Sequence, residues 1–317
     1  MSKYRTRLPQ LTSRVFLTDG GIETTIIFDE GIDLIDFAAF PLVSEEVGQE
    51  ILQRYFDRYA EIAVRDGLGI VLETPTWRAN PDWAARQRYG STELVTINRK
   101  SVELLLDVRR RFETPEVPVV ISGCIGPRGD GYKPDTLMST SEAKAYHAAQ
   151  IRTFAESEAD LVTAITMTYV EEAIGIAEAA KSSGIPVVIS FTVETDGRLP
   201  TAQELGAAII AVDEATDGYP AYYMVNCAHP SHLLLALDSN EPWHDRLRGL
   251  RANASKLSHD ELDEAEELDR GNPKELAADY AYMYGKLPAL TVLGGCCGTT
   301  HEHVRAISEM LHKLAGS

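Results

Sequence analysis

Residues 117–122 read VPVVIS, residues 186–191 read PVVISF and residues 290–293 read LTVL. These runs are almost wholly apolar, as expected for parallel β-strands covered on both faces, whereas a half-exposed antiparallel strand would alternate polar and apolar residues. Outward from these runs, similar short segments recur with helical stretches between them, which is typical of βαβ units. The predicted strands are 15–18, 69–73, 117–122, 161–165, 186–191, 222–226, 247–250 and 290–293. Eight such units in 317 residues predict an α/β fold, a (β/α)8 TIM-type barrel that residues 1–317 form as a single domain.

The segments between the strands carry helix and loop signals. Patterns of the S/T-x-x-E capping-box type predict where helices begin. They occur at Ser139 with Glu142, at Thr201 with Glu204 and at Ser258 with Glu261. Segments 78–89 and 126–134 contain Trp, Gly and Pro and are predicted to be loops or short 3₁₀ turns that follow strands. The acidic stretch within residues 253–273 is interpreted as a solvated helix and turn that cover an outer face of the barrel.

Composition and charge limit the partners of this chain. Thirty Lys and Arg against 48 Asp and Glu give a net charge of −18, which argues against nucleic acid as a partner. No run reaches the roughly 18 apolar residues of a membrane span, and the N-terminal residues lack the apolar core of a signal peptide. Four cysteines, two of them adjacent, do not form a secreted disulfide framework, so reduced thiols and a cytoplasmic location are expected. A homo-oligomer, common among soluble barrels, is left open.

Three cysteines follow strands whose carboxyl ends should meet. Cys227 follows the sixth predicted strand, and Cys296 and Cys297 follow the eighth, so their side chains can converge at the C-terminal face of the barrel. The adjacent pair is poorly placed for a mutual disulfide, because bridged Cα atoms lie about 5.5 Å apart and sequence neighbours about 3.8 Å apart. Three thiolates with one open position are typical of a catalytic zinc site. We therefore predict that Cys227, Cys296 and Cys297 bind Zn²⁺ and that a thiol substrate, activated as a thiolate, takes the open position.

Other polar residues also follow strands and are candidates for substrate binding. The turn formed by Asp19, Gly20 and Gly21 follows the first strand, and its backbone N–H groups could form an anion-binding nest. Further candidates are Glu73 and Thr74 after the second strand and Asn226 at the end of the sixth. Cys124 is interpreted as an inert buried cysteine, and His229 as a loop contact rather than a metal ligand.

Together these landmarks resemble the homocysteine S-methyltransferase family along nearly the whole chain. The resemblance rests on Thr18–Gly21 (TDGG), Glu73–Thr76 (ETPT), Ser122–Pro127 (SGCIGP), Ile189–Thr192 (ISFT), Val225–Cys227 (VNC) with Pro230, and Gly294–Thr299 (GGCCGT). It implies a (β/α)8 barrel, zinc held by the three cysteines, a homocysteine thiol as the fourth ligand and a substrate carboxylate near Asp19–Gly21. After the fourth strand the family usually has a Glu-Thr pair whose Glu receives the substrate ammonium, and here Ile165 stands in place of that Glu. Loss of such a contact should weaken binding roughly ten- to a hundredfold, unless another carboxylate such as Glu73 takes the ammonium.

Three functions are therefore weighed. The first is an S-methyltransferase that moves a methyl group from a small donor, such as S-methylmethionine or a betaine-like compound, to a zinc-bound thiolate, with homocysteine giving methionine. Trp77 and Trp83 could face a cationic donor. The second keeps the zinc chemistry but uses a thiol or selenol acceptor without the amino group, as Ile165 suggests. The third is a non-catalytic protein that binds zinc or thiols.

Overall fold

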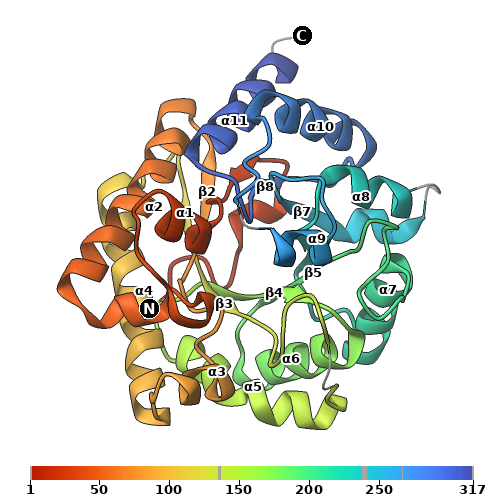
Figure 1. Cartoon of the computed structure of the whole chain (residues 1–317). Helices are drawn as coiled ribbons and strands as arrows, with labels where there is room; N and C mark the ends of the chain where they lie inside the picture. The colour runs from red at the N-terminus through yellow and green to blue at the C-terminus, as the bar shows by residue number, and fades with distance from the viewer. Residues whose placement is uncertain (1, 135–136, 238–240, 266, 316–317) are drawn as a thin grey trace.

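The computed structural model describes residues 2–134, 137–237, 241–265 and 267–315. Its eight strands are parallel and close into a barrel, in which each strand pairs with the next and β8 pairs with β1. The strands are β1 (Phe16–Leu17), β2 (Gly69–Glu73), β3 (Val119–Ile125), β4 (Leu161–Met167), β5 (Val187–Phe191), β6 (Tyr222–Asn226), β7 (Leu247–Ala252) and β8 (Val292–Gly295). Figure 1 looks along the barrel and shows the strands inside a ring of helices. The predicted (β/α)8 barrel is confirmed.

Helices connect the strands and cover the outside of the barrel (Figure 1). The α-helices are α1 (Ile22–Phe28), α2 (Glu46–Asp66), α3 (Pro81–Arg86), α4 (Ser91–Phe112), α5 (Thr140–Ala155), α6 (Val170–Ser183), α7 (Leu205–Thr216), α8 (Pro230–Leu234), α9 (His259–Glu264), α10 (Pro273–Lys286) and α11 (His301–Ala315). Short 3₁₀ helices are η1 (Pro9–Leu11), η2 (Ile35–Phe37), η3 (Phe40–Ser44), η4 (Leu235–Leu237) and η5 (Pro242–Arg246). Among the residues that the structure describes, no helix is both long enough and apolar enough to cross a bilayer.

The strands bury both of their faces, which explains their continuous apolar sequence. One buried cluster combines single residues from most strands, including Phe16, Val120 and Met224, with Leu8 from the N-terminal segment. Because side chains alternate along a strand, these residues fill the barrel interior, while their neighbours face the helices. The second and larger cluster joins the outer faces of the strands to helices such as α2 and α4. The filled interior gives the residues at the carboxyl ends of the strands a rigid base.

The predicted strands agree with the structure to within a few residues, and two capping boxes are confirmed. Ser139 and Ser258 each cap their helix, with Glu142 and Glu261 completing the box. The third box is wrong, because α7 begins at Leu205 with no side-chain cap. Instead, the Thr201 hydroxyl donates to the carbonyl of Thr168, which ties this loop to the β4–α6 connection. A further difference is that the segment predicted as a loop at 78–89 includes the short helix α3.

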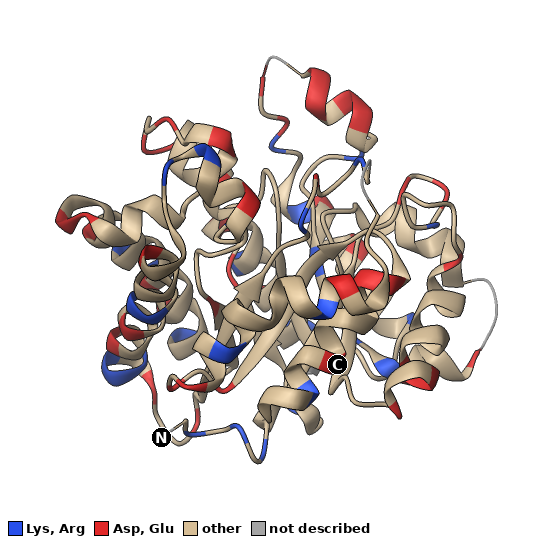
Figure 2. Ribbon diagram, turned by 90° about the horizontal axis from the view of Figure 1, so that it is seen from below, with Lys and Arg blue, Asp and Glu red and all other residues tan. Residues whose placement is uncertain are grey.

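The acidic stretch does not lie on an outer face, so that prediction is wrong. Its helix α9 lies over the barrel mouth in Figure 1, and Figure 2 shows it standing out from one end of the barrel with its acidic residues in red. The carboxylates are exposed as expected, but Leu262 and Leu268 turn inward and line a pocket at that end. An amphipathic segment can thus be solvated on one side and still close a site on the other.

Candidate metal centre and its pocket

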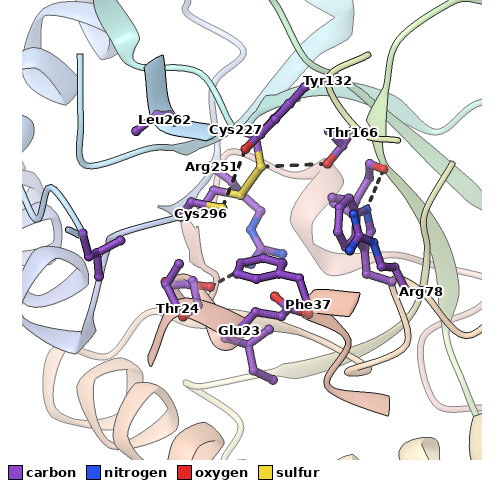
Figure 3. Close-up of a pocket in the computed structure, with 18 of the residues that line it drawn as sticks. Glu23, Thr24, Phe37, Arg78, Tyr132, Thr166, Cys227, Arg251, Leu262 and Cys296 are labelled. Atoms are coloured by element: carbon purple, nitrogen blue, oxygen red, sulfur yellow. Dashed lines mark hydrogen bonds between the residues drawn. A yellow bond between two sulfur atoms is a disulfide. The ribbon is translucent and has the colours of Figure 1, made fainter. Parts of the chain in front are cut away.

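The three predicted cysteine ligands meet at the C-terminal face of the barrel. Cys227 directly follows β6, while Cys296 and Cys297 directly follow β8, so only β7 separates the two strands. The sulfur atoms of the three residues lie within 4.8 Å of one another. Figure 3 shows Cys227 and Cys296 at the centre of the pocket, below Tyr132. The structure therefore brings together the three residues that strand order alone predicted to converge.

An unusual backbone conformation aims Cys227 into the site. Its φ is +54° and that of Thr166 is +64°, in the left-handed region that residues with a Cβ rarely adopt. The amide of Asn226 links the two, because its Oδ1 accepts a hydrogen bond from Thr166 N (2.9 Å) and its Nδ2 donates to Thr166 Oγ1 (2.8 Å). The Cys227 carbonyl in turn accepts bonds from Asn253 Nδ2 at 3.0 Å and His259 Nε2 at 2.9 Å. These bonds hold the turn that presents the sulfur.

The turn after β8 packs against the first turn of α1. Gly21 N donates to the Thr299 carbonyl at 3.1 Å, and Gly298 N donates to Thr24 Oγ1 at 3.2 Å. A Cβ on Gly21 would come within 2.6 Å of the Cys296 carbonyl oxygen, so only glycine allows this approach. The Asp19–Gly21 turn predicted to bind substrate thus also supports the cysteine pair.

Cys227 and Cys296 are joined by a disulfide in this structure, while Cys297 and Cys124 are free. The expectation that all the thiols are reduced is therefore wrong for this pair. The bridge forms because residues from strands two places apart converge on one point, which is the same convergence that would bring them to a metal. A disulfide and a metal use the same two sulfurs and exclude each other, since metal binding needs thiolates.

The donor set fits zinc once the bridge is reduced. Sulfur ligands about 2.3 Å from a tetrahedral ion lie roughly 3.8 Å from one another, which agrees with three sulfurs within 4.8 Å. Burial raises the pKa of the Cys297 thiol to about 11, and the charge of Glu23 adds to this effect. Ionisation of this thiol at neutral pH therefore needs a cation beside it. The ligand set Cys227, Cys296 and Cys297 remains a prediction.

A buried ion-pair cluster lies beside the cysteines, and sequence reasoning missed its centre, Arg251. This residue lies on β7, between the strands that carry the cysteines. Its guanidinium pairs with Asp19 at 2.6 Å and with Glu73, and it also donates to the Gly295 carbonyl at 3.1 Å. Burial alone would lower the pKa of Arg251, but the two carboxylates raise it instead. The signal available in the sequence was a second arginine, Arg251, near the carboxyl end of the seventh strand, LRGLRA, where it is buried.

The pocket above these groups has a volume of about 390 Å³ and a strongly acidic wall. Its described acidic residues are Asp19, Glu23, Glu73, Asp130, Asp263, Glu267 and Asp269, against two basic residues, Arg78 and Arg251. Aromatic and aliphatic side chains fill the remainder, among them Phe37, Tyr132 and Ile165. A cationic ligand would therefore find both negative charge and apolar surface.

Most of the predicted substrate-binding residues line this pocket, including Gly20, Gly21, Glu73, Thr74 and Ile165. Their contact with substrate remains a prediction. Asn226 is fully buried behind the wall and holds the turn at Thr166 rather than facing the cavity.

Four residues outside the predicted ligand set can now be placed. Cys124 lines the pocket as a free, buried thiol outside the sulfur cluster. His229 caps α8 by accepting from Ser231 N at 3.2 Å, which agrees with its interpretation as a loop contact. Trp77 and Trp83 already face a cation, because the guanidinium of Arg78 lies 4.8 and 3.8 Å from their ring centroids.

Comparisons with known proteins show the family of this chain. The chain is similar to homocysteine methyltransferase MmuM of Escherichia coli in its metallated form (TM-score 0.71, 19% identity, 93% of this chain and 96% of that one) and its oxidized form (TM-score 0.75, 20% identity, 97% and 99%). It is 26% identical over 327 residues to methionine synthase of Mycobacterium leprae (strain TN), covering 95% of this chain but only 24% of that protein. The chain thus spans about a quarter of that relative. Because residues 16–311 match the family described as Homocysteine S-methyltransferase, the chain belongs to the homocysteine S-methyltransferase family.

Proposed function

We propose that this protein is an S-methyltransferase that transfers a methyl group from a small cationic donor to the sulfur of a thiol acceptor, with homocysteine as the acceptor and methionine as the product. The observation that carries the proposal is the meeting of three cysteine sulfurs, within 4.8 Å of one another, on the floor of an acidic pocket. Family membership supports methyl transfer to homocysteine. The names of the relatives, homocysteine methyltransferase and methionine synthase, point the same way.

Cys227, Cys296 and Cys297 would hold the zinc ion in this proposal. When bound, zinc would supply thiol activation, because coordination lowers the pKa of a thiol from about 8.5 so that it is ionised at neutral pH. The protein's own contribution is to aim the three sulfurs through the left-handed backbone conformations at Cys227 and Gly298. It also surrounds them with buried residues that exclude water.

The wall of the pocket favours a methyl donor that carries a positive charge. Acidic side chains outnumber basic ones by seven to two among its described residues, so a sulfonium or quaternary ammonium compound would be attracted. Phe37 and Tyr132 add aromatic surface, which suits a methylated cation without N–H groups. A donor such as S-methylmethionine or a betaine-like compound meets both conditions.

Tyr132 is placed to cover the cysteine cluster. Its hydroxyl lies 3.8 Å from Cys297 Sγ, and its ring stacks on His259 with 4.0 Å between centroids. His259 is itself held by the Cys227 carbonyl and by Glu194, whose Oε1 lies 2.9 Å from His259 Nδ1. This chain of contacts ties the β3–α5 and β7–α10 connections together above the sulfurs and limits access of water to the bound thiol.

A second candidate uses the same chemistry on a thiol or selenol without an amino group. The observation that favours it is Ile165, an apolar residue on the pocket wall where a carboxylate would otherwise receive an ammonium. Both candidates need the same metal site, so they differ only in the acceptor.

The experiment that tests the proposal combines metal analysis with turnover. The reduced protein should bind one zinc ion, and X-ray absorption should show three sulfur ligands that become four on addition of homocysteine. S-methylmethionine should then yield methionine. Cys297→Ala should lose zinc and turnover, while Cys124→Ala should keep zinc.

The remaining outcomes separate the alternatives. Three sulfurs that stay three with homocysteine, but become four with a thiol that lacks the amino group, would move the assignment to the second candidate. Tight zinc with no turnover for any donor and acceptor would refute methyl transfer and indicate a zinc-binding protein.

A further inference from the structure

We propose that Glu23 is the residue that receives the ammonium group of an amino-thiol acceptor. The inference rests on the proposed function and deepens it, because it assigns the acceptor's amino group to a wall of the pocket that sequence reasoning did not consider. It would make the site selective for amino acids despite Ile165.

The charge partners within the pocket support this assignment by elimination. Asp19 and Glu73 share Arg251, and Asp19 also accepts from the Tyr55 hydroxyl at 3.1 Å. These two carboxylates are therefore already compensated, so Glu73, the alternative considered from the sequence, is poorly placed to bind a substrate ammonium.

The remaining carboxylates of the pocket differ in whether they already have a partner and in how exposed they are. Asp130 pairs with Arg78 at 3.6 Å, and Asp263 pairs with Lys133 at 3.4 Å. Asp269 accepts from Ser255 Oγ and from Gly271 N. Glu267 is exposed at the rim. Glu23 is only partly exposed, and within the described part of the chain it has no ion pair within 4 Å.

The helix turn that carries Glu23 contacts the turn that follows the two adjacent cysteines. Glu23 lies in the first turn of α1, and its neighbour Thr24 accepts from Gly298 N, next to Cys297. Figure 3 shows Glu23 among the residues that line the same pocket as Cys227 and Cys296. Glu23 and the three cysteines thus line one pocket, and homocysteine has only two methylene groups between its sulfur and the carbon that bears the amino group.

The chemistry of the two substrates decides which of them Glu23 binds. A primary ammonium has N–H groups that donate strong hydrogen bonds to a carboxylate. A sulfonium or a quaternary ammonium has no N–H group and is better matched by aromatic rings such as Phe37 and Tyr132. A partly buried carboxylate without a cationic partner, such as Glu23, is stabilised by a ligand that supplies the cation. The amino-thiol acceptor meets this need, and the methylated donor centre does not.

The test uses binding of the product, because it requires neither zinc nor donor. Isothermal titration of the reduced wild-type protein should show methionine binding ten- to a hundredfold more tightly than 4-(methylthio)butanoate, which lacks only the amino group. Glu23→Gln should reduce this ratio to near one by weakening methionine alone. Glu103→Gln, which removes the same charge from an exposed position on α4, should keep the wild-type ratio.

Two results would overturn the inference: an unchanged ratio in Glu23→Gln, or a wild-type protein that binds both compounds equally or not at all. Methyl-transfer assays on the same preparations separate this inference from the proposed function. If the selectivity depends on Glu23 but no donor gives turnover, the role of Glu23 stands and the proposed function falls. If turnover proceeds with thiols regardless of an amino group, and equally in Glu23→Gln, the proposed function stands and the inference falls.

Discussion

The strongest energetic prediction concerns Arg251, whose guanidinium compensates two buried carboxylates. Arg251→Met removes the positive charge and keeps much of the side-chain volume, so Asp19 and Glu73 would be left buried without a cationic partner. Removal of one member of a buried ion pair costs about 3–5 kcal/mol. With an unfolding entropy of about 2.1 cal/mol/K per residue, 317 residues give about 0.7 kcal/mol/K. A loss of 4 kcal/mol should therefore lower the melting temperature by about 6 °C.

The loss of stability in Arg251→Met should also depend on pH. Burial already raises the pKa of Glu73 to about 7, against the opposing effect of Arg251. Without the arginine this pKa rises further, so the folded variant binds protons that the unfolded chain releases. Its stability is then retained at low pH and lost as pH rises, by up to about 1.4 kcal/mol per pH unit for each carboxyl group held protonated. The variant should therefore lie closer to wild type at pH 6 than at pH 8.

Urea denaturation of both proteins at pH 6, 7 and 8 provides the measurement. Adding Asp19→Asn and Glu73→Gln to Arg251→Met should restore much of the stability, because no buried charge then remains. Arg109→Met is a matched control, since it breaks the buried pair with Asp160 away from the pocket and should destabilise the protein without changing ligand affinity. A deficit below about 1 kcal/mol in Arg251→Met, or one that is the same at all three pH values, would refute this reasoning.

Two further predictions test the wall that carries Glu23. Burial raises the pKa of Glu23 to about 7; Asp19 adds to this rise, while Arg78 and Arg251 oppose it. Glu23 should therefore gain its negative charge as pH rises through 7. Methionine should then bind up to about tenfold more tightly at pH 8 than at pH 6. Calorimetry with 4-(methylthio)butanoate is the control, because its affinity reports the titration of Glu73 and the other groups nearby. An equal gain in affinity between pH 6 and pH 8 for this compound would contradict the prediction. Ile165→Glu should raise the rate of methyl transfer to homocysteine little in the wild-type background but about tenfold in the Glu23→Gln background, because only that background lacks a carboxylate for the ammonium. Steady-state kinetics check this. No gain in either background would show that position 165 cannot supply the contact.

The sequence predicted the barrel well because its strands are buried on both faces and so read as short apolar runs. One place where the pattern failed is where glycine continues a strand. β8 extends through Gly294 and Gly295, which pair with Arg251 and Ala252 of β7, yet glycine gives no strand signal. Backbone pairing with a neighbouring strand, rather than side-chain type, sets the end of β8.

The site could be predicted where it depends on the order of the strands, but not where it depends on the direction in which side chains point. Strand order brought Cys227 to the adjacent cysteines. By contrast, the role of Arg251 exists only because Asp19 and Glu73 point at it from other strands, and the inward face of the acidic segment depends on which way Leu262 turns. The positive φ of Cys227 is likewise a backbone conformation that no side-chain pattern predicts.

The left-handed turns at Thr166 and Cys227 have a consequence for protein engineering. Each of these conformations costs about 1–3 kcal/mol in a residue that has a Cβ, and the hydrogen bonds of Asn226 hold Thr166 in place. The protein therefore gives up stability at the point where its sulfur is aimed. A library selected only for heat resistance should accumulate substitutions that relax these two turns, and such variants would melt later while losing the alignment of their thiols. Screens for stabilised forms of this barrel should keep positions 166, 226 and 227 fixed.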